Sequence, residues 1–287
     1  MVGRLNLTAA PVDQRSIRLD GVPPFEMKVH AEGDIFISQY ILRDGIWEPC
    51  ETKALIKLLA ADADFLDIGA NIGWYTILAS GALKDRGMVH AFEPDPSNFS
   101  ILMENVALNK VTNASCHNAG ASDHSAGGRL FLDTINKGDH RLYDSSDGRD
   151  SVAVRTIPID EYDGIDPSRA LIIKLDTQGS EVPILRGMRK LLVGHPKEIV
   201  LICEFWPFGL ERNGSSAGEL IEMIESAGFE PFTIGENKLL KSDWSTLLAR
   251  SEDDCAPSTQ RHADFVAFRS GSKMKFLVQD MIVTDSY

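Results

Sequence analysis

Acidic residues stand at the ends of several apolar runs, and they are the residues of this chain best placed to do chemistry. Asp67, Glu93, Asp176 and Glu204 each close, or directly follow, an apolar run short enough to be a buried strand. In a parallel sheet with helices between its strands, ligands bind at the carboxyl ends of the strands. Four carboxylates at that edge therefore predict a polar binding site.

The segment after the first of these strands has the composition of a ligand-binding turn. Asp67, Gly69, Asn71 and Gly73 precede residues 74–79, a run that can form a helix. Small residues let a ligand approach the backbone, and the N–H groups at a helix start attract it. The Gly-x-x-x-Gly spacing matches the dinucleotide fingerprint only in part.

The charge of Asp67 decides which ligand this turn favours. A carboxylate close to a pyrophosphate is unfavourable because like charges repel. The same carboxylate attracts an ammonium or a sulfonium group, and S-adenosylmethionine carries both. We therefore predict S-adenosylmethionine as the cofactor. A phosphate-binding turn with an incidental aspartate and a strand end without a ligand are the alternatives.

Glu93 and Asn118 are predicted to hold the nucleoside part of the cofactor. Glu93 ends the second strand 20 residues after Gly73, the spacing at which a carboxylate meets ribose hydroxyls. A carboxylate can accept from both hydroxyls at once; the alternative is a surface glutamate before a proline turn. Asn118 ends the third strand, where adenine-contacting side chains project, although a plain turn asparagine fits equally well.

The order of elements predicts one α/β domain with short additions at both ends. Apolar strands alternate with amphipathic helices, which implies a mostly parallel sheet. Residues 1–60 are predicted to be an N-terminal extension of strands and a helix that covers the cofactor site. Residues 61–271 form the main domain in this interpretation, and residues 272–287 form a C-terminal tail.

Local patterns give more detail. In the extension we expect a loosely packed arm at residues 1–24, strands at 25–30 and 34–38, and a helix at 51–60. Later segments predict a hairpin of residues 128–132 and 152–157 around a long polar loop, and a helix over 181–192.

Composition limits the partners and the compartment. The 287 residues are 43% hydrophobic and 25% charged, as in ordinary globular proteins. The net charge of −13 disfavours nucleic acid, whose phosphates would be repelled. Four scattered cysteines without a CxxC pair argue against zinc and for a reducing, cytoplasmic compartment, and no apolar run suits a membrane span. A homo-oligomer stays open, because residues 275–278 could pair with a second subunit.

Three motifs together resemble the FkbM family of S-adenosylmethionine-dependent methyltransferases. They lie at residues 65–73 (FLDIGANIG), 90–99 (HAFEPDPSNF) and 173–181 (IKLDTQGSE), and the resemblance covers roughly residues 45–270. It implies a class I, Rossmann-like fold with a seven-stranded sheet and helices on both faces. It also implies methyl transfer to a hydroxyl of a small molecule, a sugar or glycan, or a polyketide-like alcohol. The family pattern generally has an acidic residue where this chain has Gln178, which indicates altered substrate contacts.

His140, Asp176 and Glu204 are the candidates for activating such a hydroxyl, which is a poor nucleophile until it loses its proton. His140 comes first because its pKa lies near neutrality and Asp139 could orient it; a solvated loop histidine is the alternative. Asp176 ends the strand beside the methyl position and could orient the substrate or act as the base. Asp176 and Glu204 would also suit magnesium, but no third ligand is evident and no metal site is predicted. Arg141 could bind an anionic group of the substrate.

Two other functions stay open at this point. The first is a nicotinamide-dependent oxidoreductase, which would bind NAD(P) in the same crevice. The second is a non-catalytic protein that binds the cofactor, or a partner, for regulation or assembly. The presence of Asp176 and His140 argues mildly against the second.

Overall fold

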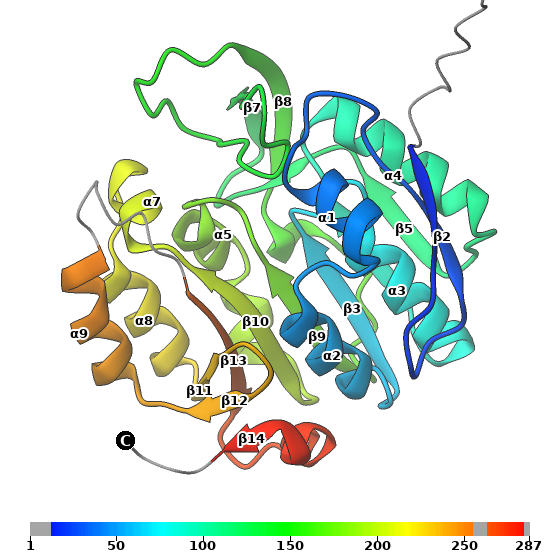
Figure 1. Cartoon of the computed structure of the whole chain (residues 1–287). Helices are drawn as coiled ribbons and strands as arrows, with labels where there is room; N and C mark the ends of the chain where they lie inside the picture. The colour runs from blue at the N-terminus through cyan, green and yellow to red at the C-terminus, as the bar shows by residue number, and fades with distance from the viewer. Residues whose placement is uncertain (1–12, 255–262, 284–287) are drawn as a thin grey trace, which may run out of the picture.

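The computed structural model describes residues 13–254 and 263–283, with a nine-stranded sheet at the centre (Figure 1). Five neighbouring strands are parallel, in the order β5 (Ala114–His117), β4 (Val89–Phe92), β3 (Ala63–Ile68), β9 (Ala170–Leu175) and β10 (Ile199–Phe205). The predicted mostly parallel α/β sheet is confirmed.

Four further strands complete one side of this sheet. They are β13 (Ala263–Arg269), β11 (Phe229–Ile234), β12 (Leu239–Lys241) and β14 (Ile282–Val283). β13 is antiparallel to both β10 and β11. The sheet has two strands more than the seven expected, because β12 and β14 extend its edge beyond β11.

Helices cover both faces of the sheet, and each face has its own apolar core. One face carries α2 (Pro49–Leu58), α3 (Trp74–Leu83) and α4 (Pro96–Leu108). The other carries α5 (Glu181–Gly187), α6 (Arg189–Gly194), α8 (Ala217–Ser226) and α9 (Trp244–Asp254). Within the described ranges, no helix is both long enough and apolar enough to cross a membrane.

The single helix predicted over residues 181–192 is wrong, because two helices, α5 and α6, occupy this range. The backbone N–H groups of Lys190 and Leu191 donate to the carboxylate of Asp160, each at 2.9 Å. These bonds satisfy N–H groups that have no partner inside the first turn of a helix. Asp160 therefore stabilises a new helix start within the apolar pattern.

Side chains alternate between the two faces of the sheet along each central strand. This alternation decides which side chains at the carboxyl ends of the strands point to the face that α2 and α3 cover. Ile172 and Ile202 belong to the core on that face. Because every second side chain of a strand points the same way, Lys174 and Glu204, two positions further on, also point to it. Asp264 is the Cα partner of Glu204 on the neighbouring strand β13, which brings a second carboxylate beside the first.

The N-terminal segment forms a strand pair that packs against α3 and α4, and a helix that packs against the strand pair. β1 (Gln14–Ile17) pairs with β2 (Phe25–Lys28), and α1 (Ile37–Asp44) follows. Ile17 is buried, so the arm predicted to be loose is packed there, while residues 1–12 lie outside the described residues. The strand predicted over residues 34–38 is wrong. The carboxylate of Asp34 accepts the backbone N–H groups of Phe36 and Ser38, which favours a helix start instead.

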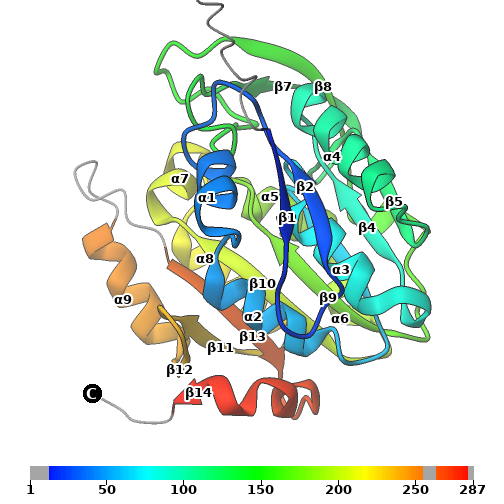
Figure 2. The same ribbon diagram turned by 45° about the vertical axis from the view of Figure 1, so that its right-hand side comes forward.

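A small second sheet stands at the carboxyl edge of the main one. β7 (Ala126–Phe131) and β8 (Ser151–Ile157) form the predicted antiparallel hairpin, and β6 (Gly120–Ala121) pairs with β8. Figures 1 and 2 both show the loop between β7 and β8 at the end of the molecule where α1 and α7 (Pro207–Arg212) lie.

The C-terminal segment packs against the main sheet. The 3₁₀ helix Met274–Met281 contacts α2 and buries Val278 completely, and β14 pairs with β12. The predicted domain boundaries at residues 60 and 271 stay a prediction.

Asn105 of α4 fastens β2 to the turn after β3. Its side-chain amide donates to the carbonyl oxygens of Lys28 and Ile72 at 2.9 and 2.8 Å, and its Oδ1 accepts from the N–H of Lys28 at 2.7 Å. We expect Asn105→Ala to lower the free energy of unfolding by about 2–4 kcal/mol, because these buried groups lose their partner. Denaturant unfolding measures the change. Met103→Ala removes an exposed side chain of the same helix and is the control; equal losses in the two variants would contradict the expectation.

Candidate active site

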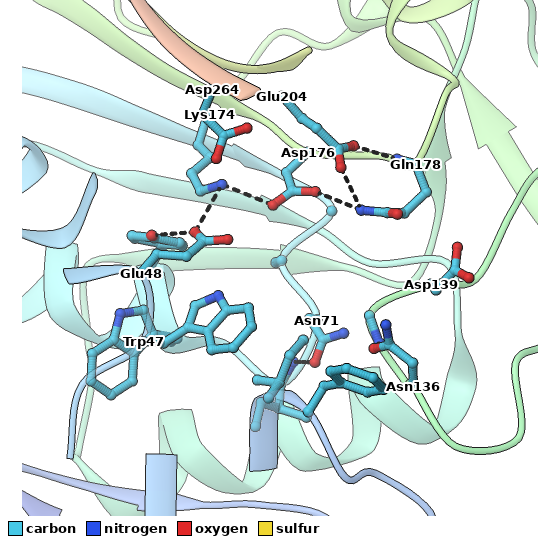
Figure 3. Close-up of a pocket in the computed structure, with 18 of the residues that line it drawn as sticks. Trp47, Glu48, Asn71, Asn136, Asp139, Lys174, Asp176, Gln178, Glu204 and Asp264 are labelled. Carbon is cyan, nitrogen blue, oxygen red and sulfur yellow. Dashed lines mark hydrogen bonds and ion pairs between the residues drawn. The ribbon is translucent and has the colours of Figure 1, made fainter. Parts of the chain in front are cut away.

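Two adjoining cavities open at the carboxyl ends of β3, β9 and β10. The larger, about 350 Å³, is here named the acidic cavity for the five carboxylates that line it: Glu48, Asp139, Asp176, Glu204 and Asp264 (Figure 3). The smaller, about 50 Å³, is named the apolar cavity for the apolar side chains that line it: Ile68, Phe92, Pro94, Ala121, Leu130, Leu142 and Ile184. Five residues line both cavities, so one extended ligand can occupy the two: Gly69, Asn71, Gly138, Asp176 and Gln178.

Gly69 lies at the seam between the cavities, and only glycine fits there. Its φ is +86°, and a Cβ would lie 2.1 Å from the carbonyl oxygen of Asp176. Gly73, with φ +91°, precedes the first residue of α3, and a Cβ on it would meet the side chain of Leu102 at 2.4 Å. The predicted glycine turn therefore forms, and it holds the ends of β3 and β9 against each other.

Asp67 does not lie where the sequence interpretation puts it. The carboxylate is 1% exposed and lines neither cavity. Its Oδ2 accepts the hydroxyl of Thr76 in the first turn of α3 at 2.6 Å, and burial raises its pKa to about 6. The prediction that Asp67 meets the cofactor is therefore corrected: Asp67 ties the end of β3 to the start of α3 and shapes the turn from outside the cavities.

Glu93 lies in the apolar cavity, at the end of β4, as expected. Its two carboxylate oxygens accept the backbone N–H groups of Asn71 at 2.7 Å and Asp95 at 2.9 Å. Burial raises its pKa to about 8. Each carboxylate oxygen can accept more than one hydrogen bond, so Glu93 keeps lone pairs for ribose hydroxyls.

Asn118 is exposed and lines neither of the two cavities. Its side-chain amide donates to the carbonyl oxygens of Glu93 at 2.9 Å and Pro94 at 3.2 Å. The geometry therefore gives Asn118 the role of bracing the backbone after β4, and no contact with a nucleoside base follows from it.

A line of alternating donors and acceptors crosses the acidic cavity (Figure 3). Lys174 lies 3.4 Å from Glu48 and 2.9 Å from Asp176, measured from its Nζ to the nearest carboxylate oxygens. The Gln178 side chain donates to Asp176 at 3.2 Å and to Glu204 at 2.9 Å. Each donor thus stands between two carboxylates.

The acidic cavity carries more negative groups than positive ones. Burial opposes the charge of Lys174, but Asp176 and Glu48 outweigh it and hold the pKa of Lys174 well above its ordinary value. Burial, reinforced by neighbouring carboxylates, raises the pKa of Glu204 and of Asp264 well above the ordinary range, and burial raises that of Glu48 to about 7. The cavity consequently favours a ligand that brings positive charge or donates hydrogen bonds.

Three residues of the acidic cavity hold an unusual backbone conformation. Glu48, Asn71 and Gln178 have positive φ angles of 42°, 50° and 53°. A left-handed backbone costs a residue with a Cβ roughly 1–2 kcal/mol. Strain of this kind gathers at functional sites, which supports a role for this cavity.

His140 lines the apolar cavity and not the acidic one. Its Nδ1 accepts the backbone N–H of Asp133 at 3.0 Å, and its Nε2 lies 3.5 Å from the Asp95 carboxylate. The prediction that Asp139 orients His140 is wrong, because Asp139 binds the guanidinium of Arg141 through two bonds of 2.8 Å. Arg141 is consequently already paired, and His140 has no lone pair directed into the acidic cavity.

The loop between β7 and β8 is held over the seam. The carbonyl oxygen of Lys137 accepts the side-chain amides of Asn71 at 2.9 Å and Asn98 at 3.0 Å. These bonds join the loop both to the glycine turn and to α4. The loop thus supplies Gly138 to both cavities.

Sequence reasoning did not place three charged residues of the acidic cavity: Glu48, Lys174 and Asp264. Asp264 carries a signal, because it lies two residues before Val266 in an apolar run and therefore faces the same side of β13 as that core residue. Glu48 carries no signal beyond its place before Pro49, the first residue of α2. Lys174 lies within the apolar strand β9, yet its Nζ contacts two cavity carboxylates.

Strand order and site together define a class of protein. The five parallel strands, the antiparallel β13 between β10 and β11, and the glycine turn after β3 form a class I S-adenosylmethionine-dependent methyltransferase fold. The sequence model of the Methyltransferase FkbM domain matches residues 67–231, more than half of the chain. The chain therefore belongs to the FkbM methyltransferase family, and its cofactor is S-adenosylmethionine. This assignment argues against the nicotinamide-dependent oxidoreductase.

Individual proteins similar to this chain have low sequence identity to it. Methyltransferase 1 of Beauveria bassiana (strain ARSEF 2860) is 26% identical over 147 residues, which cover 44% of this chain and 59% of that protein. The chain thus spans less than two thirds of this curated relative. A solved methyltransferase FkbM from Methylobacillus flagellatus KT has 17% identity and a TM-score of 0.43, over 72% of this chain and 44% of that one. A putative methyltransferase from Streptococcus mutans, solved in complex with SAH, has 12% identity and a TM-score of 0.43, over 78% and 98%.

The cavities fit the parts of S-adenosylmethionine. The apolar cavity offers apolar side chains for an adenine ring and the buried carboxylate of Glu93 for ribose hydroxyls. The acidic cavity offers carboxylates to the positively charged amino acid end. Gly69 adds no side chain to the seam, and the two cavities share lining residues there, so one extended ligand can reach both. Among the residues that the structure describes, no group of three or more histidine, cysteine or acidic side chains is placed to hold a metal ion.

Glu93→Gln tests the nucleoside end of this site. The amide keeps the volume of the side chain but replaces one oxygen by an N–H group, which cannot accept the backbone N–H bound there, and a buried donor left unpaired costs about 1–3 kcal/mol. We expect the affinity for S-adenosylhomocysteine, measured by titration calorimetry, to fall about 10- to 100-fold. Glu104→Gln, half-exposed on α4, should leave the affinity unchanged. Unaltered binding to Glu93→Gln would remove Glu93 from the cofactor site.

Proposed function

We propose that this protein transfers a methyl group from S-adenosylmethionine to a hydroxyl of a small-molecule or carbohydrate acceptor, a polyketide-like alcohol included. The observation that carries the proposal is the pairing of Asp176 and Glu204. Gln178 links the two carboxylates in the acidic cavity, and Asp176 adjoins Gly69 at the seam. A hydroxyl that enters the acidic cavity meets both hydrogen-bond acceptors beside the place where the cofactor passes.

The two carboxylates take different parts in the proposed reaction. The cofactor supplies an electrophilic methyl group bound to a positively charged sulfur. Asp176 accepts a hydrogen bond from the acceptor hydroxyl and directs its oxygen toward that methyl group, which lowers the entropic part of the barrier. Glu204 takes the proton, because burial and its acidic neighbours raise its pKa and make it the stronger base.

His140 is not the base in this proposal. It lines the apolar cavity, and the N–H of Asp133 occupies the lone pair of its Nδ1. We assign it to the wall of the nucleoside site. Among the described residues that line the acidic cavity there is no histidine, so carboxylates are the bases found there.

The proposal extends to partners and compartment. We propose that the acceptor is neither nucleic acid nor membrane lipid, in line with the net charge of −13. A reducing cytoplasmic setting and the oligomeric state stay predictions. Size-exclusion chromatography with light scattering measures the latter.

Incubation with methyl-labelled S-adenosylmethionine and a panel of glycans, sugars and polyketide-like alcohols tests the function. We expect label in an ether of at least one acceptor. Asp176→Asn should lower the turnover at least about 100-fold, because the acceptor hydroxyl loses the charged group that orients it, while S-adenosylhomocysteine affinity changes little. Asp163→Asn, an exposed loop variant, is the matched control. Full turnover in Asp176→Asn, or label in an amine in place of an ether, would contradict the proposal.

A further inference from the structure

Gln178 bridges the two carboxylates that the proposed reaction uses. Its Nε2 donates to Asp176 Oδ1 at 3.2 Å and to Glu204 Oε1 at 2.9 Å, and its backbone N–H donates to Glu204 Oε2 at 3.1 Å. Figure 3 shows the amide between the two acidic side chains. Chemistry fixes the orientation of the amide, because the opposite one would place its oxygen against carboxylate oxygens.

The surroundings of the pair resist a second negative charge. Glu204 is only 6% exposed, so water screens its charge poorly. The charged groups that act on the pair from the neighbouring elements include Lys174, Glu48, Glu181, Asp264 and Asp67. Lys174 is the one cation of this set, and its hydrogen bond goes to Asp176 Oδ2. Arg141 lines the same cavity but is paired with Asp139.

In most proteins, the repulsion between two adjoining buried carboxylates is relieved in one of two ways. They share a proton, so that one of them is neutral, or they bind a divalent cation. Neither leaves both carboxylates available to a hydroxyl. In this chain the space between Asp176 and Glu204 is instead taken by N–H groups of a neutral side chain.

We propose that Gln178 is a positioning residue whose amide stands in for the shared proton or divalent cation, holds Asp176 and Glu204 side by side and favours the ionised form of each. The bridge fixes one oxygen of Asp176, and Lys174 fixes the other, so that the carboxylate cannot rotate. The inference rests on the proposed function in one respect: that function supplies the methyl-acceptor molecule whose hydroxyl Asp176 and Glu204 would orient.

The pH dependence of stability tests the bridge. Gln178→Met keeps the length of the side chain and removes both side-chain N–H bonds, so no donor stands between the two carboxylates and the pKa of Glu204, already raised in the folded state, rises further. A carboxyl group with a raised folded pKa stabilises the fold fully below its unfolded pKa, about 4.3 for glutamate. That stabilisation is lost as the pH rises through the folded pKa.

We therefore expect the melting temperature of Gln178→Met to fall below that of the wild type by an amount that grows between about pH 5.5 and about pH 8.5. A deficit equal at both pH values would mean that the amide contributes ordinary packing and hydrogen bonding. That result, or no deficit at all, would overturn the proposal.

Gln178→Glu tests directly whether the amide takes the place of a divalent cation. The variant puts a third carboxylate between Asp176 and Glu204, and three carboxylates can bind such a cation. We expect calorimetric titration with Mn²⁺ to show binding to Gln178→Glu at least about tenfold tighter than to the wild type. Gln279→Glu adds the same charge at an exposed position and should bind Mn²⁺ no better than the wild type. Equal Mn²⁺ affinities of Gln178→Glu and the wild type would overturn the proposal.

Both measurements use the full chain without any acceptor. If no acceptor is ever methylated but the pH-dependent deficit and the gain of Mn²⁺ binding are found, the proposed function fails and the bridge stands. If methyl transfer is found but Gln178→Met shows a constant deficit, the function stands and the bridge fails.

Discussion

The close approach of two strand ends is the constraint on which the site depends. Gly69 after β3 and Asp176 after β9 come so near that a single added methyl group would lie 2.1 Å from a carbonyl oxygen. This contact joins the apolar and acidic cavities, because both are lined by the same two residues. It also sets Asp176 at the seam, beside the place where a cofactor must pass. The contact between Gly69 and Asp176 thus places the predicted nucleoside site next to the carboxylate that is proposed to bind the hydroxyl.

Repulsion between the carboxylates of the acidic cavity is the second constraint, and hydrogen-bond donors reduce it. Five carboxylates and two cations line the acidic cavity, and one of those cations, Arg141, is already paired with Asp139. Lys174 and Gln178 each lie between two carboxylates and form hydrogen bonds or ion pairs with both. These contacts reduce the electrostatic repulsion between the carboxylates. The left-handed backbone of Gln178 shows that the chain accepts local strain to place this bridge.

Sequence reasoning recovered the parts of the site that local pattern determines. Strand alternation and the glycine spacing predict the sheet, the turn and the position of Glu93, because these depend on neighbours in the chain. The orientation of Asp67 could not be predicted this way, since it depends on how α3 packs against the end of β3. Glu48 and Asp264 reach the cavity from distant segments, and the setting of His140 depends on the fold of a long loop. Tertiary packing decides all of these.

Titration calorimetry of S-adenosylhomocysteine into Gly69→Ala tests the central contact most directly. Gly194→Ala, where an added Cβ meets nothing within 4 Å, is the control. Circular dichroism confirms that each variant is folded. The account predicts micromolar affinity, roughly −8 kcal/mol, for the wild type and the control, and an affinity at least about 100-fold weaker for Gly69→Ala. Binding to Gly69→Ala as tight as to the wild type would contradict it.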